Sequence, residues 1–321
     1  MTGHTISRWA AMASLVACAA FLAGCGTSDA SGDAAVATRP FVDAQHRTVG
    51  IPVAAKRVVA LSEPAIDATL ALGMSPVGIT AGRGQQGAPG YLADRLDGVP
   101  IVATVGAVDL EKVAALHPDL IVLDETTSAK KELDKLSAIA PTVVTARLKA
   151  DWRQAFLTAA DALGKSAEGR STLDDLDRDI AVTKSRLGSN AGASVSVVRW
   201  QNGRPAAVGQ GDGPVGQTIA ALGLTRPKGQ QGEGPGHSAP VSLEMLNTID
   251  ADWIFFGTLG DRASGEAALA DAHKLQVFDQ LGGVQANHVA VVAGSAWNTT
   301  GGPLAARSVL GDLTATLTDN T

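Results

Sequence analysis

Cysteine is scarce in this 321-residue sequence, which has only Cys18 and Cys25, both near the N-terminus. Because Cys18 lies in a segment that we expect to be removed, we predict neither a disulfide framework nor a thiol nucleophile nor a cysteine-ligated metal site. Beyond the first 24 residues, no apolar run reaches the roughly 18 residues that a membrane-spanning helix needs. Basic residues are not in excess, and the net charge of −6 argues against nucleic acid as a partner.

Common catalytic motifs are also missing: the sequence has no Gly-x-Ser-x-Gly elbow, no His-Glu-x-x-His and no Walker-type loop. Asp124-Glu125 is a carboxylate pair at the end of a predicted strand, but adjacent residues on an extended chain point in opposite directions. We therefore expect a solvated loop at this pair. The chain is predicted not to be an enzyme, and a cell-envelope enzyme is the least favoured alternative.

The first 24 residues have the pattern of a lipoprotein leader. Arg8 precedes an apolar run, residues 9–21, that is too short to span a bilayer, and Leu22-Ala23-Gly24-Cys25 resembles the bacterial lipobox. We expect lipid on Cys25, with an ordinary signal peptide or a buried N-terminal helix as alternatives. The small and polar residues that follow are typical of a flexible tether, which we place at residues 25–45 together with the anchor.

The remaining chain alternates short apolar strands with helices, in the same order in two halves. Strands are predicted at 57–61 and 76–80 around a helix at 63–73, and the second half begins with a strand at 194–200 and a helix at 215–223. This alternation predicts parallel sheets covered by helices. We expect an N-terminal lobe at 46–165 and a C-terminal lobe at 189–321.

A longer pattern is repeated in both halves. Glu111 lies in the first turn of a predicted helix, and Asp119 follows eight positions later, just before an apolar strand. Glu244 and Asp252 have the same spacing and the same surroundings in the second half. Two such coincidences in the same order indicate a structural duplication.

A long helix is predicted between the halves, at residues 166–188. Leu173, Leu176, Ile180 and Leu187 recur at helical spacing, and about 21 residues would extend ~30 Å. Little Gly, Ser or Pro appears between Leu173 and Leu187, so we expect a rigid strut rather than a flexible linker.

Together these features resemble the iron-siderophore and cobalamin class of periplasmic binding proteins, which are lipoprotein partners of ABC importers. The resemblance covers almost the whole chain after the leader. It is carried by residues 56–61, 70–73, 105–106, 110–121, 139–143, Trp297, 305–306 and 309–313, of which the block around Glu111 is the most specific.

The resemblance implies an α/β fold with two Rossmann-like lobes joined by a long rigid helix, the class III periplasmic binding protein architecture. It implies a monomer that is anchored by lipid to the outer face of the cell membrane and delivers its ligand to a permease dimer. Glu111 and Glu244 would dock onto basic pockets of that permease, one from each lobe. The alternative is that both are first-turn carboxylates that complement a helix dipole.

The ligand would lie between the lobes, where loops follow the carboxyl ends of strands. Arg199 interrupts an apolar strand and needs a partner, and a guanidinium suits carboxylate, catecholate or hydroxamate oxygens. Trp297 lies in a predicted loop that favours stacking on a ligand. The full set of candidate ligand-binding residues is Arg83, Tyr91, Arg199, Trp200, His237 and Trp297.

A ferric siderophore brings its own oxygen ligands for iron, so we expect no cofactor and no metal-ligating residues in the protein. Heme is the first alternative and would need Tyr91 or His237 as an axial ligand. Cobalamin is the second and would favour a more aromatic cleft. Ala107 and Asp124 lack the arginine or aromatic residue that some siderophore binders carry nearby, so the type of siderophore stays open.

Overall fold

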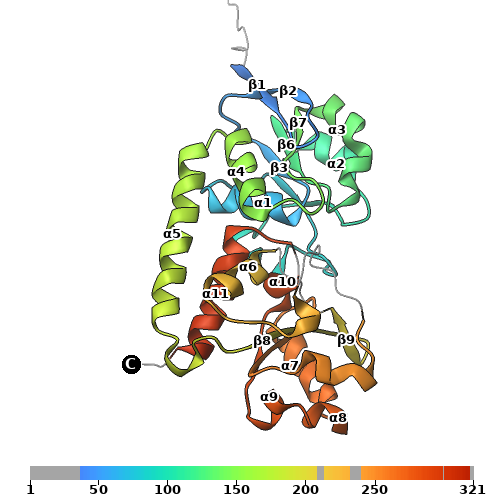
Figure 1. Ribbon diagram of the computed structural model, residues 1–321. Helices are drawn as coiled ribbons and strands as arrows, with labels where there is room; N and C mark the ends of the chain where they lie inside the picture. The colour runs from blue at the N-terminus through green and yellow to red at the C-terminus, as the bar shows by residue number, and fades with distance from the viewer. Residues whose placement is uncertain (1–36, 208–212, 232–239, 299, 319–321) are drawn as a thin grey trace, which may run out of the picture. The chain divides into compact units, whose positions relative to one another are not determined.

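The computed structural model describes residues 37–207, 213–231, 240–298 and 300–318 (Figure 1). Contacts divide the chain into residues 1–35 and one compact unit from Val36 to Thr321. The expected leader and Cys25 lie outside the described residues. Within the compact unit, the part that carries β1–β7 and α1–α4 is called the N-terminal lobe here, and the part that carries β8–β11 the C-terminal lobe.

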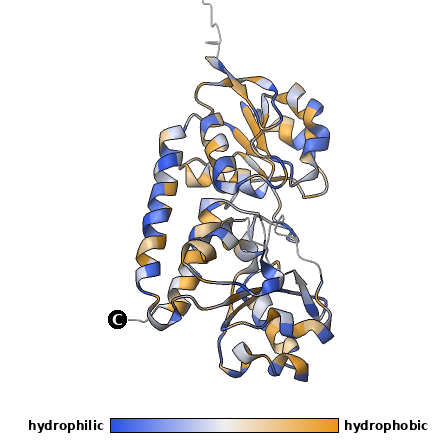
Figure 2. Ribbon diagram, in the orientation of Figure 1, coloured by the Kyte–Doolittle hydropathy of each residue, from blue (hydrophilic) through white to orange (hydrophobic). Residues whose placement is uncertain are grey.

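The N-terminal lobe is built on a five-stranded parallel sheet of order β5-β4-β3-β6-β7. Successive strand residues pack on opposite faces: Val58 and Val122 contact the core beneath α1 and α4, whereas Val59 and Ile121 contact the core beneath α2 and α3. Both faces are covered, which explains the nearly continuous apolar strands in Figure 2. The bounds are β3 Val58–Ala60, α1 Glu63–Ala71, β4 Gly78–Thr80, β5 Ile101–Ala103, α2 Leu110–Ala115, β6 Leu120–Leu123, α3 Leu133–Ile139, β7 Thr142–Val144 and α4 Trp152–Ala162.

The C-terminal lobe has a four-stranded sheet of order β11-β10-β8-β9, in which only the β8–β9 pair is antiparallel. These two strands are joined by Asn202-Gly203, both at positive φ, as a tight hairpin turn requires. The bounds are β8 Val195–Gln201, β9 Arg204–Ala207, α6 Pro214–Ala221, β10 Trp253–Gly257, α7 Arg262–Ala272, α8 Gln276–Asp279, α9 Gly282–Gln285, β11 Val289–Val291, α10 Gly294–Trp297 and α11 Pro303–Leu317. The predicted mixture of parallel sheets and covering helices is confirmed.

The predicted long helix is α5, Ser166–Ser185, which runs beside α4 and α11 in Figure 1. Leu173, Leu176 and Ile180 are buried on its inner face. Thr183 and Thr314 join α5 to α11 by a hydroxyl hydrogen bond of 2.9 Å. Short 3-10 helices complete the chain: η1 Gly90–Arg95, η2 Ser128–Glu132, η3 Gly188–Asn190, η4 Lys228–Gln230 and η5 Leu243–Ile249.

The two aspartates of the repeated pattern make the same contact in each lobe. The carboxylate of Asp119, before β6, accepts hydrogen bonds from the backbone N–H groups of Lys56 (2.8 Å) and Arg57 (3.0 Å), before β3. Asp252, before β10, accepts one from the backbone N–H of Ser194 (2.7 Å), before β8, and this hydrogen bond lowers the pKa of Asp252. Each aspartate therefore ties the starts of two neighbouring parallel strands, as expected of a structural duplication.

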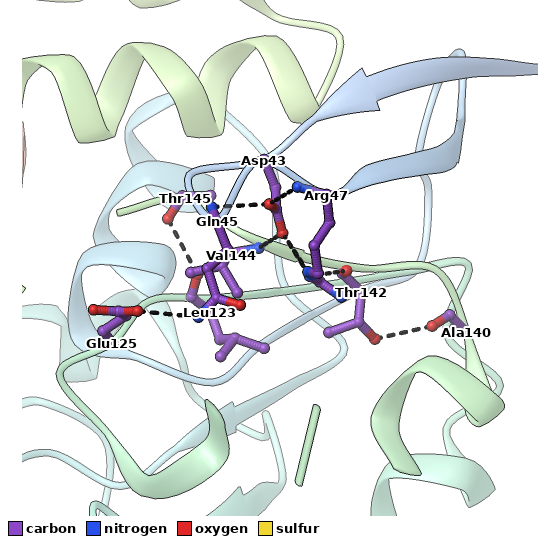
Figure 3. A network of polar contacts seen from close by, with 9 residues as sticks. All are labelled: Asp43, Gln45, Arg47, Leu123, Glu125, Ala140, Thr142, Val144 and Thr145. Atoms are coloured by element: carbon purple, nitrogen blue, oxygen red, sulfur yellow. Dashed lines mark hydrogen bonds and ion pairs between the residues drawn. The ribbon is translucent and has the colours of Figure 1, made fainter. Parts of the chain in front are cut away.

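A β-hairpin, β1 Thr38–Val42 with β2 Thr48–Pro52, covers the edge of the first sheet (Figure 3). Its turn bonds to the edge strand β7: the N–H of Ala44 donates to the carbonyl of Val144 (2.9 Å), and the N–H of Val144 donates to buried Asp43 (3.3 Å). Arg47 binds both Asp43 and the carbonyl of Thr142. The hairpin thus occupies an edge that could otherwise pair with another chain. Residues 38–45 belong to this hairpin, so the predicted tether at 25–45 extends too far, because pairing with β2 was not recognised.

Candidate functional site

A cavity of about 110 Å³ lies where the ends of β6 and β7 approach the starts of α6 and α11. Asp124 and Thr126 line it after β6, residues 145–150 line it after β7, and α4 contributes an apolar side. The C-terminal part of the chain contributes residues 213–214 and 300–302. Loops beyond the carboxyl ends of parallel strands are the usual place for ligands in α/β proteins.

Side chains of the two lobes bond to each other at two places. The side-chain amide of Gln217, on α6, donates to Asp151 at the start of α4 over 2.8 Å. The amide of Gln85, in the loop after β4, donates to the carbonyl of Leu259 over 3.3 Å. The lobes are therefore in direct contact, and a ligand between them would touch both.

Two of the predicted site residues, Arg83 and Arg199, are brought close together from different lobes. Arg199 ends the parallel part of β8 and is half-buried; burial, and then the charge of Arg83, lower its pKa. Its Nε has no hydrogen-bond partner among the described residues. The backbone N–H of Arg83 donates to Glu63 over 2.6 Å, which fixes the start of its loop. Two guanidinium groups that lie close together without a counter-charge favour an anion between them.

Asp124 is buried, with 1% of its surface exposed, so the expected solvated loop is wrong at this position. Burial raises its pKa, and hydrogen bonds from Thr126 and Ser62 and the charge of Arg83 partly oppose that rise. Its Oδ1 accepts hydrogen bonds from both the N–H (2.7 Å) and the hydroxyl (2.5 Å) of Thr126, which fix the carboxylate against the following turn. The feature of the sequence that could have indicated this burial is the position of Asp124 directly after the four apolar residues of β6.

Its neighbour Glu125 points away from Asp124's surroundings and supports the cavity wall. One oxygen accepts a hydrogen bond from the side-chain amide of Gln45 (3.0 Å), in the β1–β2 turn shown in Figure 3. The other accepts one from the backbone N–H of Leu148 (3.1 Å), within the 145–150 loop. These bonds lower the pKa of Glu125. The hairpin and the cavity loop are thus connected through a single carboxylate.

Tyr91 is engaged in a structural contact. Its hydroxyl donates to Asp67 (2.9 Å), and Asp67 also accepts hydrogen bonds from the N–H groups of Leu304 and Ala305 (each 3.0 Å), at the start of α11. Burial and the nearby charges of Asp67 and Glu63 raise the pKa of Tyr91 well above its usual value. This environment opposes the phenolate that a heme-ligating tyrosine supplies. The structure therefore does not support the predicted contact of Tyr91 with a ligand.

Trp200 is a core residue, so the prediction that it contacts the ligand is corrected. It is 4% exposed and packs against Phe256 and Phe278, with ring centroids 5.5 and 5.7 Å away. Adjacent strand residues point to opposite faces of a sheet, so Arg199 and Trp200 are expected on different faces of β8. Val195 and Val197 share one core with α6 and α11, whereas Val198 and Trp200 share the other.

Trp297 is also a core residue, and its expected stacking on a ligand is corrected. It lies in α10, is 1% exposed, and stacks on Phe255 with ring centroids 4.7 Å apart. Its indole N–H donates to Asp312 over 2.8 Å. Both ring faces are enclosed by protein, because the predicted loop is a short helix packed under α11.

Glu111 and Glu244, the predicted docking residues, are both exposed in the first turn of a helix. The helix of Glu111 is α2, capped by the side chain of Asp109. The helix of Glu244 is the 3-10 helix η5, and its neighbours Leu243 and Met245 are 38% and 53% exposed. His237 and Cys25 lie outside the described residues.

Trp152 and two cations were not predicted as site residues. Trp152 is the first residue of α4 and lines the cavity. The side chain of Asp151 caps this helix, and that capping pattern in the sequence could have placed Trp152 at the start of a helix. Arg147 and Lys149 are exposed in the 145–150 loop, where no periodic pattern in the sequence distinguishes them.

Among the described residues, no cluster of three or more His, Cys, Asp or Glu side chains could hold a metal ion. No helix in the described part of the chain is long and apolar enough to cross a membrane.

Comparison with known proteins gives consistent matches. A sequence model of the family described as "Periplasmic binding protein" matches residues 58–291. The "Probable siderophore-binding lipoprotein YfiY" of Bacillus subtilis is 30% identical over 304 residues, covering 91% of this chain and 92% of that protein. The "Achromobactin-binding periplasmic protein" of Dickeya dadantii is 25% identical, covering 80% of this chain and 85% of the relative.

Solved structures are similar over most of the chain. The structure of Staphylococcus aureus SirA complexed with staphyloferrin B has a TM-score of 0.72 and 26% identity, covering 87% of this chain and 98% of SirA. The petrobactin-binding protein YclQ of Bacillus subtilis also has a TM-score of 0.72, covering 88% of this chain and 100% of YclQ. At 18% identity, that second match shows similarity of fold alone.

Proposed function

Because the chain belongs to the periplasmic binding protein family and has its class III fold, we propose that it is the substrate-binding lipoprotein of an ABC importer. It captures a ferric siderophore between the two lobes and delivers it to the permease. The chelate supplies the iron ligands, and the protein binds the outer oxygens of the chelate. Relatives whose names specify siderophore binding support this substrate class.

The observation that carries the proposal is the proximity of Arg83 and Arg199 across the lobes. No carboxylate among the described residues forms an ion pair with either guanidinium. An anionic chelate placed between them would relieve their mutual repulsion and would accept charge-assisted hydrogen bonds from Arg199. The arrangement of Tyr91 does not favour heme, and no described contact favours cobalamin.

Arg199→Ala should weaken binding of a ferric siderophore by about 1.5–3 kcal/mol, the range for hydrogen bonds to charged groups. The measurement is a titration of the purified protein, by calorimetry and tryptophan fluorescence, against a panel of ferric siderophores, heme and cobalamin. Arg186→Ala is the matched control, because Arg186 is exposed at the end of α5. Failure of every siderophore to bind, with saturable binding of heme or cobalamin instead, would contradict the proposed substrate.

We also propose that Cys25 carries the lipid anchor, since the segment before it has the lipobox pattern. Cys25→Ala should move the protein from the membrane fraction of cells to the culture medium, as followed by immunoblotting. Cys18→Ala serves as the control and should leave the protein on the membrane. Retention of the Cys25 variant on the membrane would show that another segment anchors the chain.

A further inference from the structure

The two carboxylate oxygens of Asp124 differ in their hydrogen bonds. Thr126 occupies Oδ1 through its N–H and its hydroxyl, which fixes the orientation of the carboxylate. Oδ2 is buried and forms no hydrogen bond of 3.5 Å or less among the described residues, although the hydroxyl of Ser62 lies near the carboxylate and helps to lower its pKa. Asp124 also lines the cavity between the lobes. A buried carboxylate oxygen without a partner is costly, so its presence beside a cavity needs a physical explanation.

Much of the cavity wall is apolar and cannot solvate this oxygen. Trp152, Phe156 and Pro64 present mostly apolar atoms, and Pro214 adds another apolar surface from the C-terminal lobe. Such a wall suits a hydrocarbon chain, which gains free energy when its apolar surface leaves water. The site therefore combines an aliphatic environment with one carboxylate oxygen.

Among the described residues no cation forms an ion pair with Asp124, although Arg147 and Lys149 also line the cavity. Arg83 is close enough for its charge to lower the pKa of Asp124, but the two side chains form no ion pair of 4.0 Å or less among the described contacts. Glu63 is also buried nearby and receives the backbone N–H of Arg83. The complementary group for Oδ2 is thus a cationic N–H donor that arrives with the ligand.

We propose that Asp124 binds a protonated primary amine at the end of an aliphatic arm of the ferric chelate, and that this arm fills the cavity. The inference rests on the proposed function and narrows its substrate class to chelates that carry such an arm. The anionic oxygens of the chelate lie toward Arg83 and Arg199, and the amine lies toward Asp124. An ammonium at Oδ2 would also offset the burial that raises the pKa of this carboxyl.

The test uses two forms of one ligand: a ferric trihydroxamate with a free terminal primary amine, and the same chelate with that amine acetylated. The wild-type protein should bind the amine form about tenfold or more tightly, as expected for a hydrogen bond to a charged group. Asp124→Asn should lose this preference and should bind the two forms with similar affinity. Glu168→Gln, an exposed carboxylate on α5 that pairs with Lys165, is the matched control and should keep the preference.

The outcomes separate this inference from the proposed function. Equal binding of the two forms by the wild type, or a preference that survives in Asp124→Asn, overturns the role of Asp124 but leaves siderophore binding intact. Failure of the wild type to bind either form, or any other ferric siderophore in the panel, overturns both. The comparison of two chelates on the wild-type protein needs no variant, so misfolding of Asp124→Asn cannot obscure the result.

Discussion

Uptake of the ferric chelate by cells should fall at least about tenfold when Glu111 or Glu244 is changed to alanine, and the double variant should be close to inactive. Both carboxylates are exposed, each begins a helix, and neither lines the cavity. If they dock onto basic residues of the permease, each contributes to delivery and not to capture. Affinity for the chelate should therefore be unchanged, and the free energy of unfolding should change by only about 0.3–1 kcal/mol.

Transport of labelled iron into cells and calorimetry on the purified protein measure the two effects separately. Glu266→Ala, on α7, is the matched control, since Glu266 is also an exposed helical carboxylate. Charge reversal to lysine should impair uptake more than alanine does, because like charges would then face each other. Normal transport by both alanine variants would show that these carboxylates act only on their own helices.

Much of the fold could be predicted because local patterns agreed with it. The apolar runs ending at Leu61 and before Arg199 are strands, and the helical spacing of Leu173, Leu176 and Ile180 corresponds to the buried face of α5. The repeated Glu and Asp positions were predictable because the same spacing recurs in both halves, although Asp119 and Asp252 bond to residues 63 and 58 positions earlier in the chain. The periods and the repeated spacing are displayed by the sequence directly, whereas those hydrogen bonds are not.

The candidate site was less predictable, because it depends on contacts between distant segments. Tyr91 is positioned by Asp67 and by the start of α11, more than 200 residues away in the chain. Asp124 was interpreted as a loop carboxylate, since nothing local shows that α4 and residues 300–302 enclose it. Trp200 could have been assigned to the core, because strand alternation places it with Val198, on the face of β8 opposite Val195 and Val197.

Replacing Trp297 by alanine should lower the free energy of unfolding by about 3–5 kcal/mol, the cost of removing a large buried aromatic side chain. The indole stacks on Phe255, donates to Asp312 and is enclosed by the core beneath α11. Trp297→Phe keeps most of the packing and loses the hydrogen bond, so it should cost about 1–3 kcal/mol. Denaturant titration of the purified variants measures both values.

The Trp297→Phe variant also distinguishes a tryptophan in the core from one that stacks on the ligand. Trp297→Phe should bind the ferric siderophore with wild-type affinity and should retain the quenching of fluorescence by the ligand. Trp152→Phe should lose most of that quenching, because Trp152 lines the cavity and is near any ligand in it. Loss of both affinity and quenching in a stably folded Trp297→Phe protein would return Trp297 to the binding site, and would require α10 to open when the ligand binds.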